Sequence, residues 1–155
     1  MSTSIPTVMF PFNSQPPNIY GYRASLQVHN PRFNIIQSKF FLDLSYANWN
    51  TTQSHISIIA IAPILRFSLY DAKLTTLFFD LSAGPSYLSK TIFDHRHQGI
   101  HYAFQLIAGP GLKIGKNKNT AISWKIMHYS NSRLSHHNAG ITIPIVVSVS
   151  HLFKN

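Results

Sequence analysis

His128 and Ser130 are a residue pair that can act together as general base and nucleophile. They lie two residues apart at the end of an alternating segment, and in a β-strand such residues point to the same side. At a rise of about 3.3 Å per residue, their Cα atoms would lie about 6.6 Å apart, which an imidazole can span to reach a hydroxyl. The apolar residues of the same parity are Ile122, Trp124 and Ile126. The pattern predicts a hydrolytic pair at the end of an apolar stripe, which favours a lipid substrate.

The strand that positions this pair is one of seven segments in which apolar and polar residues alternate. These segments are 20–28, 38–48, 55–69, 76–88, 100–114, 119–130 and 141–153. Their lengths match or exceed the roughly 9–11 residues with which a tilted strand crosses a bilayer. The pattern predicts an all-β, antiparallel chain in which loops such as 89–99 and 131–140 join the strands.

The two faces of these strands differ in a way that separates a barrel from a soluble sandwich. The polar face carries isolated polar and charged residues among small ones, namely Arg23, Lys39, Asp43, Arg66, Asp80, Gln105 and Lys125. The other face carries large apolar residues, including Phe40, Leu42, Leu44, Phe79, Tyr102 and Phe104. A solvated sheet face would hold more Lys and Glu. We therefore expect a closed barrel with an apolar exterior and a narrow lumen that contains paired charges.

The lumen residues make a specific prediction about ion pairs. A buried charge without a partner is costly to keep. We expect Asp43 and Asp80 each to pair with one of the basic lumen residues, which are Arg23, Lys39, Arg66 and Lys125.

Composition agrees with a single transmembrane barrel. The chain has 155 residues, 13% of them aromatic, and only 11% are charged, against about 25% in typical soluble domains. Outer-membrane barrels of bacteria have even strand numbers. We expect an eight-stranded antiparallel barrel of the outer-membrane type over residues 1–155, with residues 1–17 irregular or a partial first strand and residues 18–153 forming the barrel strands.

The charge and residue types bear on partners and cofactors. The net charge is +9, but basic residues cluster only at Lys113, Lys116 and Lys118, and no nucleic-acid motif is present. We expect no nucleic-acid partner, and scattered cations suit an anionic lipid surface. The absence of cysteine excludes disulfides and thiolate metal sites. We expect no cofactor and no metal.

The first residues bear on export. Residues 1–22 contain no Lys or Arg and no apolar core segment. We therefore expect no signal peptide in the given sequence, although an outer-membrane location requires export.

The run WKIMHYSNSRLSHHNAGIT, residues 124–142, resembles the active-site segment of the lipid A 3-O-deacylases, the PagL family. Weaker resemblance extends over most of the chain. It implies an eight-stranded outer-membrane barrel that hydrolyses the ester-linked acyl chain at position 3 of lipid A in lipopolysaccharide. It also implies that Ser130 is the nucleophile, that His128 is the general base, and that Asn138 helps to form the oxyanion hole.

The resemblance departs from the family at the third catalytic position, where Thr142 replaces a glutamate. The sequence contains no glutamate, so a carboxylate near His128 would have to come from an aspartate. Strand counting places Asp94, in loop 89–99, on the same side of the barrel as loop 131–140. Thr142 has the parity of the polar face in its strand, so we expect it to point inward.

Two other functions remain open on the sequence alone. The first is a catalytically impaired or inactive barrel with a structural or lipid-binding role, because Thr142 lacks the charge of the family glutamate. The second is a soluble lipid-binding barrel with an apolar interior. A measurement of ester hydrolysis would distinguish the inactive barrel from the enzyme. Dependence on detergent would distinguish the soluble lipid-binding barrel from both membrane barrels.

Overall fold

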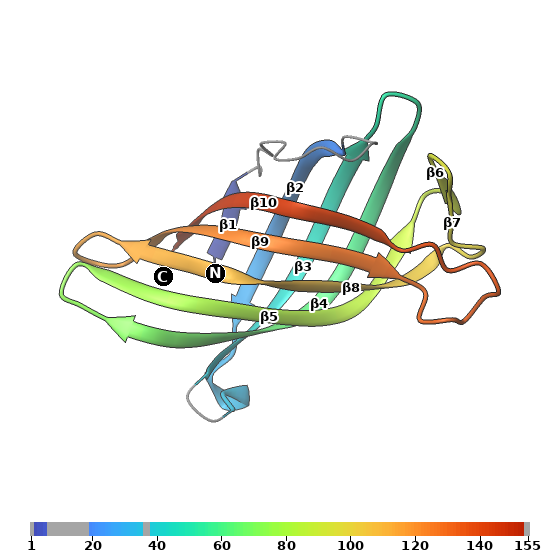
Figure 1. Cartoon of the computed structure of the whole chain (residues 1–155). Coiled ribbons are helices and arrows are strands. Elements are labelled where there is room, and N and C mark those ends of the chain that lie inside the picture. The colour runs from blue at the N-terminus through green and yellow to red at the C-terminus, as the bar shows by residue number, and fades with distance from the viewer. Residues whose placement is uncertain (1, 6–18, 36–37, 154–155) are drawn as a thin grey trace.

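The computed structural model of the chain describes residues 2–5, 19–35 and 38–153, and its long strands pair antiparallel around a curled sheet (Figure 1). The long strands are β2 (Tyr20–His29), β3 (Ser38–Asn50), β4 (His55–Asp71), β5 (Thr75–Leu88), β8 (Tyr102–Ile114), β9 (Thr120–Ser130) and β10 (Ile141–Leu152). With β1 (Ser2–Ile5) they close in the order β1-β10-β9-β8-β5-β4-β3-β2. The predicted all-β, antiparallel class is confirmed.

Three short elements decorate the barrel. A 3-10 helix, η1 (Pro31–Phe33), lies between β2 and β3. Strands β6 (Ile92–Phe93) and β7 (Arg96–His97) form a separate hairpin between β5 and β8. We call the barrel end that carries this hairpin the hairpin end, and the opposite end the η1 end (Figure 1). Among the described residues, no helix is long and apolar enough to cross a membrane.

Residues 1–17, which were predicted to be irregular or a partial first strand, include β1, which pairs with both β10 and β2. The rest of that stretch, residues 6–17, lies outside the described residues.

The apolar face of the strands points outward, as predicted. Leu44 on β3 is 52% exposed and Tyr102 on β8 is 66% exposed, whereas the side chains of Asp43 and Asp80 are fully buried. Outward side chains therefore form an exposed apolar surface of a kind that soluble monomers rarely show. A soluble lipid carrier would show the reverse arrangement, with a polar exterior around an apolar interior.

The predicted lumen ion pairs are confirmed. Arg23 pairs with Asp43, which also accepts a hydrogen bond from Gln27 Nε2 at 3.1 Å. Arg66 Nε and Lys125 Nζ lie 2.7 Å and 2.8 Å from the two carboxylate oxygens of Asp80. Each buried aspartate therefore has at least one cationic partner, which offsets the desolvation of both charges.

Replacing Asp80 should destabilise the barrel strongly. Asp80→Asn keeps the shape of the side chain but leaves Arg66 and Lys125 buried without a counter-charge. Removing one partner of a buried pair typically costs about 3–5 kcal/mol of unfolding free energy. Urea unfolding in lipid vesicles measures the loss. The control is Asp71→Asn, which breaks an exposed pair with Lys118 and should change little. Equal unfolding midpoints for the two variants would contradict the assignment.

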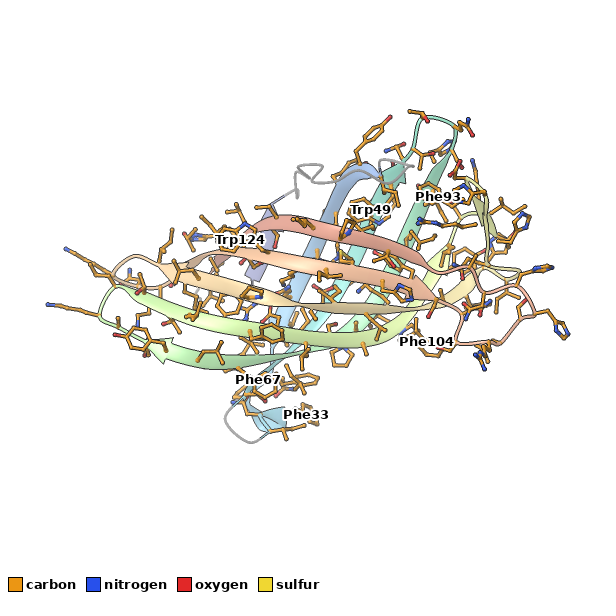
Figure 2. The ribbon with its side chains drawn as sticks, viewed as in Figure 1. Phe33, Trp49, Phe67, Phe93, Phe104 and Trp124 are labelled. Atoms are coloured by element: carbon orange, nitrogen blue, oxygen red, sulfur yellow. The ribbon has the colours of Figure 1, made fainter. Side chains whose placement is uncertain are left out.

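The interior at the hairpin end is apolar, which the prediction of a charged lumen did not include. The fully buried side chains there include Trp49 on β3, Ile56 on β4, Phe93 on β6 and Tyr129 on β9. Figure 2 labels Trp49 and Phe93 at this end, and Phe33 and Phe67 near η1. These side chains form one buried cluster. The cluster supports the strand ends that carry His128 and Ser130 from the inside.

The outward orientation of Thr142 corrects the sequence prediction. Thr142 is exposed, whereas its neighbours Ile141 and Ile143 are fully buried. The pairing of β10 with β9 shifts register between Ile143 and Val146. A bulge adds one residue on one strand, so the inside and outside positions exchange across it. Parity counted back from the end of β10 therefore assigned the wrong face to Thr142.

Candidate active site

His128 and Thr142 form the most specific contact of the site. They lie directly opposite each other on β9 and β10. His128 Nδ1 is 2.8 Å from Thr142 Oγ1, a hydrogen-bond distance. Directly opposed residues on one face of an antiparallel pair have Cβ atoms about 5 Å apart, so this bond follows from the register. In the tautomer in which Nδ1 donates its hydrogen to Thr142 Oγ1, Nε2 is the nitrogen that can accept a proton.

Ser130 lies one outward position further along β9, close to the hairpin end. It is half-buried, as is His128. The residue that pairs with it on the neighbouring strand β8 is Phe104. Figure 2 shows Phe104 at the end of the barrel where β9 leads into the loop to β10. Across the described part of the chain, no hydrogen bond joins Ser130 Oγ to the imidazole. Catalytic hydrogen bonds are often absent or long until substrate binds.

Asn138 is anchored beside Ser130. Its side-chain Oδ1 accepts a hydrogen bond of 3.0 Å from the backbone N–H of Asn131, the residue that follows Ser130. Since a backbone N–H requires an acceptor, this bond fixes which end of the carboxamide faces Asn131. The Nδ2 group of Asn138 is then the donor that can serve an oxyanion.

Gly140 packs against the imidazole. A Cβ atom at this position would lie 2.5 Å from His128 Cε1 and 3.0 Å from Nε2. Any larger residue would therefore displace the ring edge that carries Nε2. The glycine makes room for the imidazole in the position in which Thr142 contacts it.

An apolar groove of about 680 Å³ runs along the outer surface from His128. Its lining residues come from five strands and one loop, and they are Ile35, Phe40, Pro63, Leu65, Leu81, Ser82, Ala83, Leu106, Ile107, Ala108, Ile126 and His128. Of the predicted apolar stripe on β9, Ile126 lines the groove. The groove crosses from β9 to β3, which is four strand spacings or about 19 Å.

A second, polar cavity of about 600 Å³ lies in the loop between β9 and β10. It is lined by Arg133, Leu134, Ser135, His136 and Asn138. Asn138 thus belongs both to this cavity and to the contact with the Ser130–Asn131 peptide. The apolar groove includes His128 and the polar cavity includes Asn138, a combination that fits an amphiphilic molecule.

Asp94 has a different partner from the one that sequence reasoning considered. Its Oδ2 lies 2.6 Å from Nδ1 of His95, in the turn of the β6–β7 hairpin. The structure therefore brings Thr142, and not Asp94, to His128. Among the described residues, no three His, Asp or Glu side chains gather into a group that could hold a metal ion.

Comparison with known proteins decides the family. Residues 20–150 match the model of the family described as lipid A 3-O-deacylase (PagL). The chain belongs to the PagL family. Its fold is similar to that in a crystal structure of the outer membrane enzyme PagL, with a TM-score of 0.78 and 18% sequence identity. The alignment covers 99% of this chain and 100% of that one. No curated protein matches the sequence.

The Thr142 contact bears on one prediction from the sequence. The resemblance of the segment 124–142 predicted that Thr142 stands where the family has a glutamate, and Thr142 Oγ1 lies 2.8 Å from His128 Nδ1. A threonine hydroxyl can orient an imidazole, but it carries no charge to stabilise an imidazolium.

Sequence reasoning gave no role to three residues that build this site. Asn131 is fully buried, and its Nδ2 donates to the backbone carbonyls of Gln98 and His137. Gln98 is also fully buried. Asn131 and Gly140 lie in the runs that resemble the PagL family, so a signal was present for both. Gln98 is a single polar residue in a loop, and nothing in the sequence marks it.

Proposed function

We propose that this protein is an eight-stranded transmembrane barrel of the bacterial outer membrane that hydrolyses the 3-O-linked acyl ester of lipid A. The observation that carries the proposal is the position of the His128–Thr142 contact, at the end of an apolar groove on the outer surface. A site that faces outward from a barrel can receive a substrate that lies within the membrane. Lipid A offers acyl chains for the groove and a polar sugar for the cavity around Asn138.

The proposed reaction assigns one role to each residue. Ser130 Oγ attacks the ester carbonyl while Nε2 of His128 takes its proton, and Asn138 Nδ2 donates to the oxyanion. The intermediate collapses when His128 returns the proton to the sugar oxygen, which leaves an acyl-serine. Water attacks the acyl-serine, again with His128 as base, and releases the fatty acid and free Ser130. Thr142 holds the imidazole in the required orientation.

A groove-filling substitution tests the acyl site. Ala108, on the outward face of β8, lines the groove. Ala108→Trp should lower the rate on lipid A by about tenfold or more, because loss of hydrophobic contact and misplacement of the ester both raise the barrier. The rate on a short, water-soluble ester should change little. Fatty-acid release from each substrate is the measurement.

Ala24→Trp is the matched control. Ala24 is an exposed alanine on β2 and lines a different outer groove. It should leave both rates unchanged. If Ala108→Trp hydrolysed lipid A as fast as Ala24→Trp, the groove would not be the acyl site.

A non-catalytic barrel that binds lipid A is the second candidate, favoured by one observation. Thr142 supplies no charge beside His128, and loss of a triad carboxylate lowers rates by about 10⁴-fold in a serine hydrolase. On this alternative the groove binds acyl chains without hydrolysis. This alternative predicts that the protein binds lipid A and that the wild-type chain and Ser130→Ala show the same fatty-acid release.

A further inference from the structure

The β6–β7 hairpin makes direct contact with the loop that holds Asn138. Both project from the hairpin end of the barrel (Figure 1). The contact joins residues 97–99, at the C-terminal side of β7, to the loop residues that flank Asn138. Residues 97–99 line neither the apolar groove nor the polar cavity.

The two backbone polar groups of Ala139, which belong to the peptide groups on either side of its Cα atom, are both held. Its N–H donates to the carbonyl of His97 at 2.9 Å, and its carbonyl accepts from Gln98 Nε2 at 2.7 Å. Ala139 lies between Asn138, whose Oδ1 accepts from the N–H of Asn131, and Gly140, which packs on His128. The position of the Ala139 backbone therefore bears on both neighbours.

Asn131 completes the connection from the other side. Its Nδ2 donates to the backbone carbonyl of Gln98 and, at 2.7 Å, to that of His137. Its Oδ1 accepts from the N–H of Arg133 at 3.0 Å. Arg133 has a φ of 66°, a left-handed conformation that a non-glycine residue adopts at a cost. The hydrogen bond to Asn131 helps to maintain this turn, as side-chain amides do in Asx-type turns.

Close packing makes the contact rigid. Gly99 has a φ of 74°, and a Cβ atom there would collide with Ser135. The imidazole rings of His97 and His137 lie with their centroids 5.9 Å apart. Gln98 and Asn131 are both fully buried. Buried side-chain hydrogen bonds are costly to break, because the groups left behind are desolvated.

We propose that Gln98 is a positioning residue, which acts through the Ala139 peptide to align Asn138 with the ester oxyanion and to keep Gly140 against His128. The inference rests on the proposed function. The β6–β7 hairpin is thereby part of the active-site support and not a free surface loop. Its role is to restrict the loop between β9 and β10, because an oxyanion donor is effective only when it is already in place.

A double-mutant cycle tests this role through kcat. Asn138→Ala should lower kcat on the order of 10²–10³-fold, as loss of an oxyanion donor does elsewhere. Gln98→Met, which has a similar shape but no donor, should lower kcat up to about 10²-fold with KM nearly unchanged, because a small displacement of the donor has this effect. In the Asn138→Ala background, Gln98→Met should lower kcat by a clearly smaller factor than it does alone, because the part of its effect that runs through Asn138 is already lost.

Two further variants separate positioning from general stability. Gln98→Asn keeps a buried carboxamide but is one methylene shorter, so its donor cannot reach Ala139 and its kcat should fall as for Gln98→Met. Gln53→Met is the control, since Gln53 is an exposed glutamine in the loop between β3 and β4. It should leave kcat unchanged. Independent, multiplying losses from Gln98→Met and Asn138→Ala would overturn the proposal, as would wild-type kcat in Gln98→Met.

Hydrogen exchange provides a readout that does not require catalysis. Amide exchange across residues 137–140 should be faster in Gln98→Met than in wild type or Gln53→Met, while exchange in β3 and β4 stays the same. Unchanged exchange in residues 137–140 would by itself overturn the proposal that Gln98 holds this loop. If the wild-type protein released no fatty acid from lipid A, the proposed function would fail, and the exchange result would still decide whether Gln98 holds the loop.

Discussion

Ser130→Ala and His128→Ala should each abolish detectable release of 3-hydroxy fatty acid from lipid A. In the proposed mechanism Ser130 supplies the bond-forming oxygen, and His128, two residues away on the same face of β9, takes its proton. In a serine protease, loss of the serine or the histidine lowers kcat by about 10⁶-fold, and loss of the acid alone by somewhat over 10⁴-fold. With Thr142 in place of that acid, we expect a further loss of roughly 10²-fold or more.

The controls for this experiment come from the same chain. Ser123 lies on β9 but faces inward, where it bonds to Ser148 at 2.7 Å. His55 is an exposed histidine at the start of β4 and contacts Lys90. Ser123→Ala and His55→Ala should therefore keep wild-type activity. Wild-type activity in Ser130→Ala or in His128→Ala would show that the catalytic assignment is wrong.

Thr142→Glu should increase the rate, with an upper limit near the 10⁴-fold loss that follows removal of a triad carboxylate. Thr142 Oγ1 already lies 2.8 Å from His128 Nδ1, on the outward face. A carboxylate in the same place would accept the same hydrogen bond and would also stabilise the imidazolium in the transition state. The measurement is kcat on lipid A.

Matched substitutions separate charge from reach. Thr142→Gln has the length of glutamate without the charge, and it should gain little. Thr142→Val removes the hydroxyl but keeps the branched shape, so it should lower the rate if the hydroxyl orients the imidazole. A gain in Thr142→Gln equal to that in Thr142→Glu would rule out the electrostatic explanation.

Asp94 offers the competing explanation, in which it replaces the family glutamate. Since Asp94 pairs with His95, we expect Asp94→Asn to keep full activity. A large loss in Asp94→Asn, with no gain in Thr142→Glu, would instead assign the acid to the hairpin. Full activity in Asp94→Asn and no gain in Thr142→Glu would mean that catalysis here uses no acid at either place.

The strands could be predicted from sequence because burial imposes a period of two on them. Leu42 and Leu44 face outward, while Asp43 between them is fully buried. The predicted segment 55–69 corresponds to β4, His55–Asp71. Whether a position faces outward or inward decides whether its residue is apolar or polar, so the alternation appears directly in the sequence of each strand.

The orientation of Thr142 could not be predicted in the same way. A one-residue shift in pairing exchanges the faces of a strand, and the irregularity between Ile143 and Val146 produces such a shift. Ile141, Ile143 and Ile145 suggested one continuous apolar face. The structure places the first two inside, in the buried cluster at the hairpin end.

The contacts around Gln98 could not be predicted from the sequence for another reason. It depends on contacts between residues 97–98 and residues 131–139, which are remote in sequence and belong to irregular loops. Loops carry no periodic signal, and their hydrogen bonds are fixed by tertiary packing. Residue types and spacing identified His128 and Ser130, and the resemblance to the PagL family added Asn138, but neither identified Gln98, which we propose holds the loop of Asn138.

Mass spectrometry of lipid A after incubation with the purified protein in detergent tests the central claim most directly. The protein, with Ser130→Ala as its paired control, is added to lipid A whose acyl positions are known. We predict loss of one 3-hydroxyacyl group from position 3 with the wild-type chain and an unchanged spectrum with Ser130→Ala. An unchanged spectrum with both proteins, or the same loss with both, would contradict the account.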